Sequence, residues 1–504
     1  MAADPQYPDC EVTVPLPEND TAWPPRSITP LYAEIRVDDA WYSGDPKKLA
    51  DVYRHAPQHR HDGRRRLWGR HRPPHKREQR LHIPLAGEIA QTSADLLFAD
   101  TPVVTVADTA TQDRLDVLLD AGGVPELLLT SAETAAALSG VFLRVTWDKA
   151  AAPDRPLLTA VHPDQAVPEW SFGIMQAVTF WRALPSTSST VWRHLERHER
   201  GRILHGLYEG TGDQLGQRVP LTEHSDTAGL VDSLGEQGDA IETGVDMLTA
   251  VYVPNIAPNR RHRGAPWGRS DLQGVHDLLD ALDETWSSWL RDIRLARARL
   301  IVPDGYLRSN GPGRGATFDD DREVWQTLAI PPTEQGNGIT LSQFAIRVEE
   351  HRTTAEAIVR QATTAAGYSP ASVGLDGDGA AVTATEIAAR DHRSMVTRGK
   401  KGRYWRRGVA DILHVLLAVD RVQFGSRITP ERPTVDIGGG VAEDPTSTAQ
   451  TLALLTQAQA VSTDTKVRAL HPDWDDTAVA EEVERILAET GQAVPDPMQA
   501  GALV

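Results

Sequence analysis

The chain has 504 residues, of which 40% are hydrophobic and 24% are charged, and its formal net charge is −18. This composition is typical of a globular protein and excludes a disordered or membrane-embedded chain, and the negative charge argues against a protein that grips nucleic acid over its whole surface. The lone Cys10 excludes an intramolecular disulfide framework and a cysteine-based zinc cluster. The chain begins MAADPQYPDC, without a signal segment, so we expect neither export nor membrane insertion.

The region before residue 80 is predicted to be rich in loops, with one short helix at about 49–54. Ten Lys or Arg residues fall between Arg54 and Arg80, so we expect a mobile loop with an exposed contact surface there. Histidines in and beside this run could ligate a metal: His55, His59, His61, His71, His75 and His82. Because the arginines interleaved with them repel a cation, a solvated basic loop is the better interpretation.

A mixed body of helices and strands follows. Periodic apolar positions predict helices at 85–98, 112–119 and 125–138. Alternating apolar residues from Val141 to Trp147 then indicate a strand. Further strands are expected at 157–161, 176–184, 191–195, 203–209 and 248–253, because turn-forming residues separate these segments. The fold class is therefore predicted to be α+β.

Two long helices are predicted after this body. A capping-box pair at Ser270 and Gln273 precedes apolar residues at alternating steps of three and four, which predicts a helix over 269–300. A second pair, at positions 340 and 343, opens another apolar run and predicts a helix over 340–366. We expect the two helices to pack along one another or along neighbours.

Residues 301–339 connect these helices and are rich in Gly and Pro, with one plausible strand at 324–330. So short an excursion cannot build a core of its own. Identical tips in a ring could pair edge to edge, and the candidate contact residues are Val324, Trp325, Leu328 and Ile330. A flexible loop in solvent is the alternative.

A glycine-rich loop at 367–383 leads into a third long helix at about 385–419. The first half of this helix is basic, and its second half has a predicted core face made of Val409, Ile412, Leu413 and Leu416. A short strand is expected beyond Pro430. The region from 441 to the end carries 11 acids against three bases and predicts a helical subdomain, with helices near 446–460, 463–470 and 477–487.

Motifs for catalysis, cofactors and metals give no convincing match. The chain has no G-x-x-x-x-G-K-[ST] loop and no G-x-S-x-G elbow, and the GPGRG at 311–315 lacks the setting of a dinucleotide loop. Asp376 and Asp378 resemble the start of a calcium loop, but Glu386 falls one position short of the required end. The acids at 319–321 have no second cluster to complete a two-metal site. We therefore predict no catalytic, cofactor-binding or metal-binding residue, and no enzyme.

The order of predicted elements resembles that of the portal proteins of long-tailed bacteriophages, and in particular of actinobacteriophages. Five strings carry the resemblance and occur in the expected order: HIPLAGEIAQTSADLLFADTP at 82–102, VYVPNIAPNRR at 251–261, DALDETWSSWLRDIRLARARLIVP at 280–303, GDGAAVTATEIAARDHRSMVTRGKKGRYWR at 377–406 and LHPDWDD at 470–476. Together they span nearly the whole chain, although none is a chemical motif by itself.

The resemblance implies a division of the chain into the named parts of a portal subunit. These are a mixed α+β wing at 1–268, a stem made of helices at 269–300 and 340–366, a small α/β clip at 301–339, a tunnel loop at 367–383, a long wing helix and return strand at 384–440, and a helical crown at 441–504. It also implies that the tunnel loop faces DNA, through Gly374, Asp376, Gly377, Asp378, Gly379 and Thr383.

The same resemblance implies the partners and the place of the protein. It predicts a homo-oligomeric ring, commonly of twelve subunits, around double-stranded DNA, with no membrane partner. Its other partners would be the large terminase, a head-completion or adaptor protein and the major capsid protein, with a scaffolding protein as a further candidate. The ring would sit at the portal vertex of the virion after assembly in the host bacterial cytoplasm.

Two alternatives stay open from the sequence. The basic runs and the acids at 319–321 would also suit a DNA-processing enzyme such as a packaging nuclease, which would cleave DNA in a metal-dependent way. A monomeric helical scaffold would instead keep a mass near 55.1 kDa at all concentrations.

Overall fold

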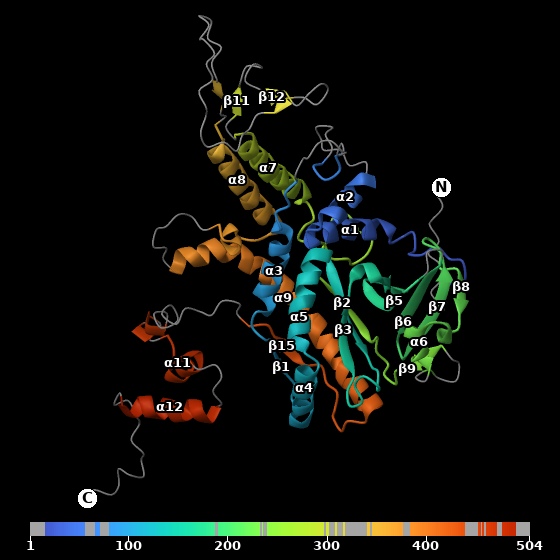
Figure 1. The fold of residues 1–504 in the computed structure, drawn as a ribbon. Coiled ribbons are helices and arrows are strands. Elements are labelled where there is room, and N and C mark those ends of the chain that lie inside the picture. Colours follow the sequence, from blue (N-terminus) through green and yellow to red (C-terminus); the bar gives the residue numbers. More distant parts are fainter. Residues whose placement is uncertain are drawn as a thin grey trace, which may run out of the picture.

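The protein is an α+β molecule, as predicted, and its helices and strands alternate along the chain in the computed structural model (Figure 1). The structure describes residues 16–55, 66–70, 80–186, 190–231, 234, 239–296, 299–301, 308–309, 316–317, 340–342, 345–375, 384–438, 452–454, 456–457, 460–470 and 476–489. Within these residues, no helix is long and apolar enough to cross a membrane.

Five helices form the N-terminal part of the body: α1 (Thr29–Ser43), α2 (Pro46–His55), α3 (Leu85–Phe98), α4 (Thr109–Ala121) and α5 (Val124–Leu138). The last three confirm the sequence prediction, with α3 matching it residue for residue. Helix α1 corrects the prediction of a loop-rich start. Its pattern is hard to recognise because Asp38 is buried within it beside His276, so a charged residue stands where an apolar one is expected.

Two antiparallel sheets follow. In the three-stranded sheet, β2 (Gly140–Thr146) lies between β10 (Ala250–Pro254) and β3 (Leu157–Val161). The six-stranded sheet has the order β4 (Ala166–Ser171), β5 (Ile174–Leu184), β6 (Val191–Glu199), β7 (Arg202–Gly210) and β8 (Gln217–Val219), and β9 (Ala240–Glu242) also pairs with β7. Shorter helical turns lie at Pro163–Gln165, Leu221–Glu223 and α6 (Ser225–Ala228). The predicted strands are confirmed, several with small changes at their ends.

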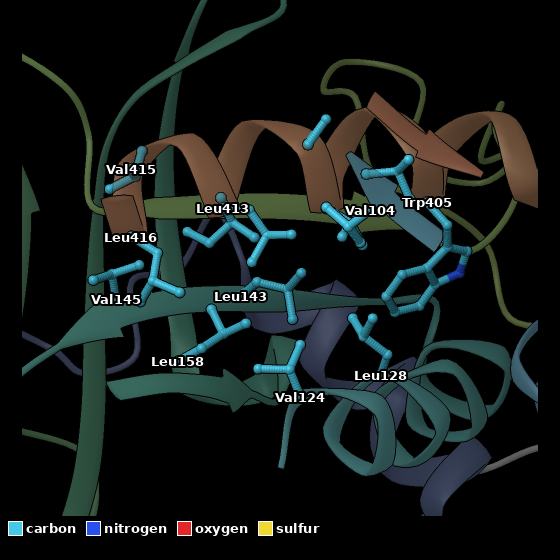
Figure 2. Packing of buried hydrophobic residues seen from close by; sticks show 14 of the residues in the cluster. Val104, Val124, Leu128, Leu143, Val145, Leu158, Trp405, Leu413, Val415 and Leu416 are labelled. Carbon is cyan, nitrogen blue, oxygen red and sulfur yellow. The ribbon is translucent and has the colours of Figure 1, made fainter. Parts of the chain in front are cut away.

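The main core lies where α9 (Ala384–Phe424) crosses the three-stranded sheet. The predicted face of this helix is confirmed, because Val409, Ile412, Leu413 and Leu416 are all buried. Figure 2 shows Leu413 and Leu416 above the β2 side chains, with Trp405 at one end of the cluster. The helix ends before Gly425, which has a left-handed φ of 70°. The chain then returns as β15 (Thr434–Asp436), which pairs with β1 (Val103–Thr105).

Helices α7 (His276–Leu295) and α8 (Val348–Ala366) lie side by side and project from the body at the upper left of Figure 1. Both are shorter than predicted. The hydroxyl of Ser270 accepts from the backbone N–H of Leu272, not from that of residue 273, and Gly274 has a left-handed φ of 95°, so α7 begins at residue 276.

The far ends of these two helices are joined by strands instead of continuing as helix. The predicted cap at residue 340 is wrong, since β14 (Thr340–Ser342) pairs with β11 (Arg299–Ile301). Beyond them, β12 (Arg308–Ser309) pairs with β13 (Ala316–Thr317). The candidate contact residues Val324, Trp325, Leu328 and Ile330 lie outside the described residues, as do the acids at 319–321. Near the C-terminus, α11 (Thr463–Leu470) and α12 (Asp476–Glu489) agree with the predicted helices.

Candidate functional site at the base of the glycine-rich loop

A buried ionic cluster joins the long helix to both projecting helices. Lys401 of α9 is 1% exposed, and its Nζ donates to Asp271 Oδ2 at 2.5 Å and to Ser93 Oγ at 2.6 Å. It also lies 2.8 Å from the hydroxyl oxygen of Tyr368. Asp271 precedes α7 and Tyr368 follows α8, so one ammonium group connects α9 with the body ends of both helices.

The carboxylate in this cluster is held from every side. Tyr368 Oη donates to Asp271 Oδ2 at 2.7 Å, and Asn255 Nδ2 donates to Oδ1 at 2.8 Å. The backbone N–H of Asp271 donates to the carbonyl of Ala136. A buried pair is costly to desolvate and is stable only when such extra hydrogen bonds complete it. We call Lys401, Asp271, Tyr368, Ser93 and Asn255 the lysine junction.

Burial sets the charge states in the lysine junction. Removal from water lowers the pKa of Lys401, and the Asp271 carboxylate opposes that shift. Burial also raises the pKa of the Tyr368 hydroxyl well above its usual value, and the neighbouring Asp271 charge adds to the effect. Tyr368 is therefore a neutral donor, which fits its hydrogen bond to the carboxylate.

The same face of α9 also fixes the backbone that enters the glycine-rich loop. Thr397 Oγ1 donates to the carbonyl of Gly367 at 2.6 Å, and the backbone N–H of Ser369 donates to Ser394 Oγ at 2.8 Å. Ser394, Thr397 and Lys401 are spaced by three and four residues, so they lie on one side of the helix. This polar spacing was visible in the sequence, but the basic composition of the segment hid that one of its lysines is buried.

Of the predicted loop residues, Gly374 is the one that the structure describes. It follows the short helical turn Pro370–Val373 and has a left-handed φ of 75°, a conformation that favours glycine. The other predicted loop residues, Asp376, Gly377, Asp378, Gly379 and Thr383, lie outside the described residues. The entry to the loop is thus held by hydrogen bonds to α9 and turned by Gly374.

The projecting pair of helices is held together by a polar and aromatic contact. Asp292 of α7 accepts from Arg347 at 2.9 Å and lies 3.1 Å from His351 Nε2 of α8. These contacts lower the pKa of the Asp292 carboxyl, with His351 the largest cause. The imidazole of His351 also stacks on Trp289, with 5.9 Å between the ring centroids. The two helices are therefore connected near their outer ends as well as at the lysine junction.

Residues 66–70 of the basic segment are anchored on α7, which corrects the prediction of a solvated loop for this part of it. Two fully buried carboxylates of α7 hold it: Asp280 accepts from the backbone N–H of Leu67 at 2.9 Å, and Asp283 accepts from Trp68 Nε1 at 2.9 Å. His82 Nδ1 lies 2.8 Å from Asp283 Oδ2, and its side chain is 8% exposed. His82 is therefore a buried hydrogen-bonding residue, whereas His59, His61, His71 and His75 lie outside the described residues.

Histidines also gather inside the six-stranded sheet. His194 and His205 stack with 3.1 Å between their ring nitrogens, and His198 lies 2.8 Å from the half-buried Glu196. Burial lowers the pKa of His194 to about 4. In the part of the chain that the structure describes, no three His, Cys, Asp or Glu side chains are grouped so as to hold a metal ion.

Comparison with known proteins identifies a family for this chain. The family model described as phage portal protein, SPP1 Gp6-like, matches residues 30–496. A chain in the structure titled "Virion of native gene transfer agent (GTA) particle" is 12% identical with a TM-score of 0.43, over 90% of this chain and 96% of that one. A chain from the "Neck of empty GTA particle computed with C6 symmetry" is 14% identical with a TM-score of 0.39, over 77% of this chain and 90% of that one. No curated protein matches this sequence.

Proposed function

Since this chain belongs to the SPP1 Gp6-like family of phage portal proteins, we propose that copies of it form the ring through which double-stranded DNA enters and leaves the capsid. The family match over residues 30–496 carries this proposal. The protein is a structural component of the virion and not an enzyme. The alternative function of a packaging nuclease is therefore excluded. The finer assignment to long-tailed actinobacteriophages rests on the five sequence strings given above.

The proposed parts of the portal subunit follow the described elements. Helices α7 and α8 would form the stem, and strands β12 and β13 would belong to the clip at 301–339. The body up to residue 268 would form the wing together with α9 and β15, and the acidic region from 441 would form the crown. The projection of α7 and α8 from the body supports this division, since two exposed helices gain stability by packing against copies of themselves.

The proposed mechanism is geometric and electrostatic. The loop at 367–383 would face the DNA, with Asp376 and Asp378 as its only charges. A ring of such loops would present negative charge to the phosphates, which would prevent adhesion while the loops follow the duplex. The fixed entry of the loop at Gly367 and Ser369 supports this idea, because it lets the tip change conformation without disturbing the helices.

The proposed partners are the large terminase and the head-completion protein at the clip, and the major capsid and scaffolding proteins at the wing. Assembly would take place in the host bacterial cytoplasm, and twelve is the proposed copy number. Val324, Trp325, Leu328 and Ile330 are the proposed contact residues of the clip. Replacing Trp325 with Ala should weaken ring formation in a sedimentation assay, and an unchanged ring population would contradict the proposed clip contact.

Ring formation is the direct test of the function. Purified protein is expected to give ring-shaped particles in negative-stain images and a light-scattering mass that is a multiple of 55.1 kDa. A mass of one chain at every concentration, also in the presence of scaffolding protein, would favour the monomeric scaffold instead.

The loop charge is tested separately in phage. Changing both Asp376 and Asp378 to lysine should leave rings intact, because a loop tip contributes little to packing, and should lower the yield of packaged genomes. A matched change of Asp to Asn at both positions should have the smaller effect, since it removes repulsion without adding attraction. Normal genome yield with lysine at both positions would contradict the electrostatic mechanism.

A further inference from the structure

The first half of α9 carries a row of exposed basic side chains on the side opposite the lysine junction. The five cations are Arg393, Lys400, Arg403, Arg406 and Arg407, and at about 100° per residue they fall on one side of the helix. Arg407 lies 3.7 Å from Asp411, and the other four have no acidic partner among the described residues. Val396 lies among them and is 42% exposed. We call these six residues the basic face of α9.

The C-terminal helices are a second unit that lacks a complete environment. Helices α11 and α12 have 8 and 14 residues and pack on each other, without extensive contact to another described element. Leu470 at the end of α11 is 54% exposed. Two helices of this length cannot bury a core that would hold them folded by themselves. They therefore need a surface of the protein or of a partner to pack against.

The charge of this helix pair is the opposite of that of the basic face. Within α12, Glu481, Glu484 and Glu489 are exposed and have no basic partner among the described residues. Glu482 forms an ion pair with Arg485, with 2.6 Å between the carboxylate oxygen and the guanidinium nitrogen. The whole region from residue 441 has 11 acids and three bases, so it gathers negative charge that nothing described there neutralises.

The chain leads into this acidic region from the first half of α9, on the side of the helix that faces away from the basic face. Arg398 of α9 donates to the carbonyl of Ile437 at 2.8 Å and to that of Gly438 at 2.6 Å. Gly438 is the last described residue before the acidic region, and Arg398 lies between Arg393 and Lys400 in sequence. This attachment keeps the acidic helices at high effective concentration near the basic face. Residues 439–451, which precede the helical residues at 452–454, could span roughly 40 Å when extended.

We propose that α11 and α12 dock on the basic face of α9 of the same chain, with their acidic side against its cations. Figure 1 draws the helix pair and the first half of α9 on the same side of the body. Docking covers Val396 and supplies the surface that the two short helices lack. It also closes the basic face to other polyanions, so a duplex and the C-terminal helices compete for one surface. The proposal concerns the fold of a single chain and does not depend on ring formation.

Charge reversal tests the proposal by amide hydrogen exchange in α12. Lys400→Glu with Arg403→Glu should speed exchange of the α12 amides about tenfold, as expected when several surface ion pairs are lost together. Glu481→Lys with Glu484→Lys should have the same effect, and combining all four changes should restore slow exchange. Exchange that is equally fast in the unaltered protein and in every variant would overturn the proposal.

A matched control makes this result specific. Arg26→Glu with Arg36→Glu makes the same change in net charge at two exposed positions away from α9, and should leave α12 exchange unchanged. Faster exchange in this control would show a general effect of charge and would count against docking. Binding of a short DNA duplex is measured in parallel. If Lys400→Glu with Arg403→Glu weakens duplex binding while α12 exchange stays as it was, DNA and not the acidic helix pair is the partner.

A disulfide trap then decides whether docking is within one chain. Cys10→Ser removes the natural thiol, and Val396→Cys with Ala488→Cys places one thiol on each exposed surface. Oxidation should give a monomer whose tryptic digest contains peptides of α9 and α12 joined together. A covalent dimer as the main product would overturn the assignment to the same chain, and failure to form either product would overturn docking.

Discussion

The two halves of α9 are fixed by different forces. The second half, from Trp405 to Val419, buries apolar side chains against the sheet of β2, β3 and β10, as Figure 2 shows. The first half buries Ser394, Thr397 and Lys401, which make hydrogen bonds and an ion pair to the segments around the glycine-rich loop. One continuous helix therefore has an apolar attachment at one end and a polar attachment at the other.

This difference has a consequence for how each attachment responds to change. Apolar contacts are non-directional and tolerate small displacements, whereas a buried ion pair is stable only in one geometry. The second half thus holds the helix in the body, and the first half specifies where the ends of α7, α8 and the loop lie. Substitutions in the two halves should differ in cost and in how far the cost can be recovered by a second substitution.

The largest effect is expected at the lysine junction. Lys401→Ala leaves the Asp271 carboxylate buried without its cation and should lower the free energy of unfolding by about 3–5 kcal/mol. Urea unfolding followed by tryptophan fluorescence measures this loss. Lys400→Ala, on the exposed side of the same turn, should change it by no more than about 0.5 kcal/mol. Equal effects of the two substitutions would contradict the claim that the buried and exposed sides of the helix contribute differently to stability.

A double substitution separates the pair from its surroundings. Lys401→Met with Asp271→Leu removes both charges, and should recover part of the loss caused by Lys401→Ala because no lone buried charge is left. Recovery should be incomplete, since Asn255 and Tyr368 would lose the carboxylate that they bind. No recovery at all would mean that desolvated charge is not the cause of the loss.

The apolar half should give a somewhat smaller effect that does not depend on charge. Leu413→Ala creates a cavity in the main core and should cost about 2–5 kcal/mol in the free energy of unfolding. The cost should be the same in low and high salt, because no charged group is involved. Val422→Ala, 48% exposed on the same helix, is the matched control and should change the free energy little. A strong salt dependence of the Leu413→Ala effect would contradict the apolar assignment.

The smallest effect is expected at the loop entry. Thr397→Val keeps the shape of the side chain but removes the hydroxyl that donates to the Gly367 carbonyl, and should cost about 1 kcal/mol. The local effect should be larger than the global one, with faster hydrogen exchange at residues 367–375 and unchanged exchange in β2. Val422→Ala serves again as the exposed control. If exchange rises equally everywhere, Thr397 contributes to general stability and not to the loop entry.

Much of the body could be predicted because its sequence patterns are local. Helix α3 and strand β3 match their predicted ranges, since each combines an unbroken apolar pattern with clear flanking residues. The core face of α9 was also predictable, as Ile412 and Leu413 sit in a regular helical repeat. Where the apolar pattern lies within one helix or strand, the buried face of that element can be predicted from it.

The failures share a different cause, which is a polar residue whose partner lies far away in sequence. The carboxylate of Asp38 contacts His276, and the imidazole of His82 contacts Asp283. In each pair, the two residues are more than 200 positions apart in sequence. The lysine junction was not predicted for the same reason, because no pattern near Lys401 in the sequence indicates that Asp271 is its partner. Capping pairs misled as well, because the Ser270 hydroxyl accepts from the N–H two residues later, one residue earlier than a capping box requires.

The pairing of β1 with β15 bears on how the protein is made. Val104 lies opposite Val435, so the body is closed by a strand that the ribosome produces more than 300 residues after its neighbour. The apolar faces of α5 and β2 likewise stay uncovered until the second half of α9 has been synthesised. Long-range contacts of this kind form late and leave apolar surface uncovered until then. A nascent or truncated chain that ends before residue 405 therefore lacks the α9 side chains that complete this core.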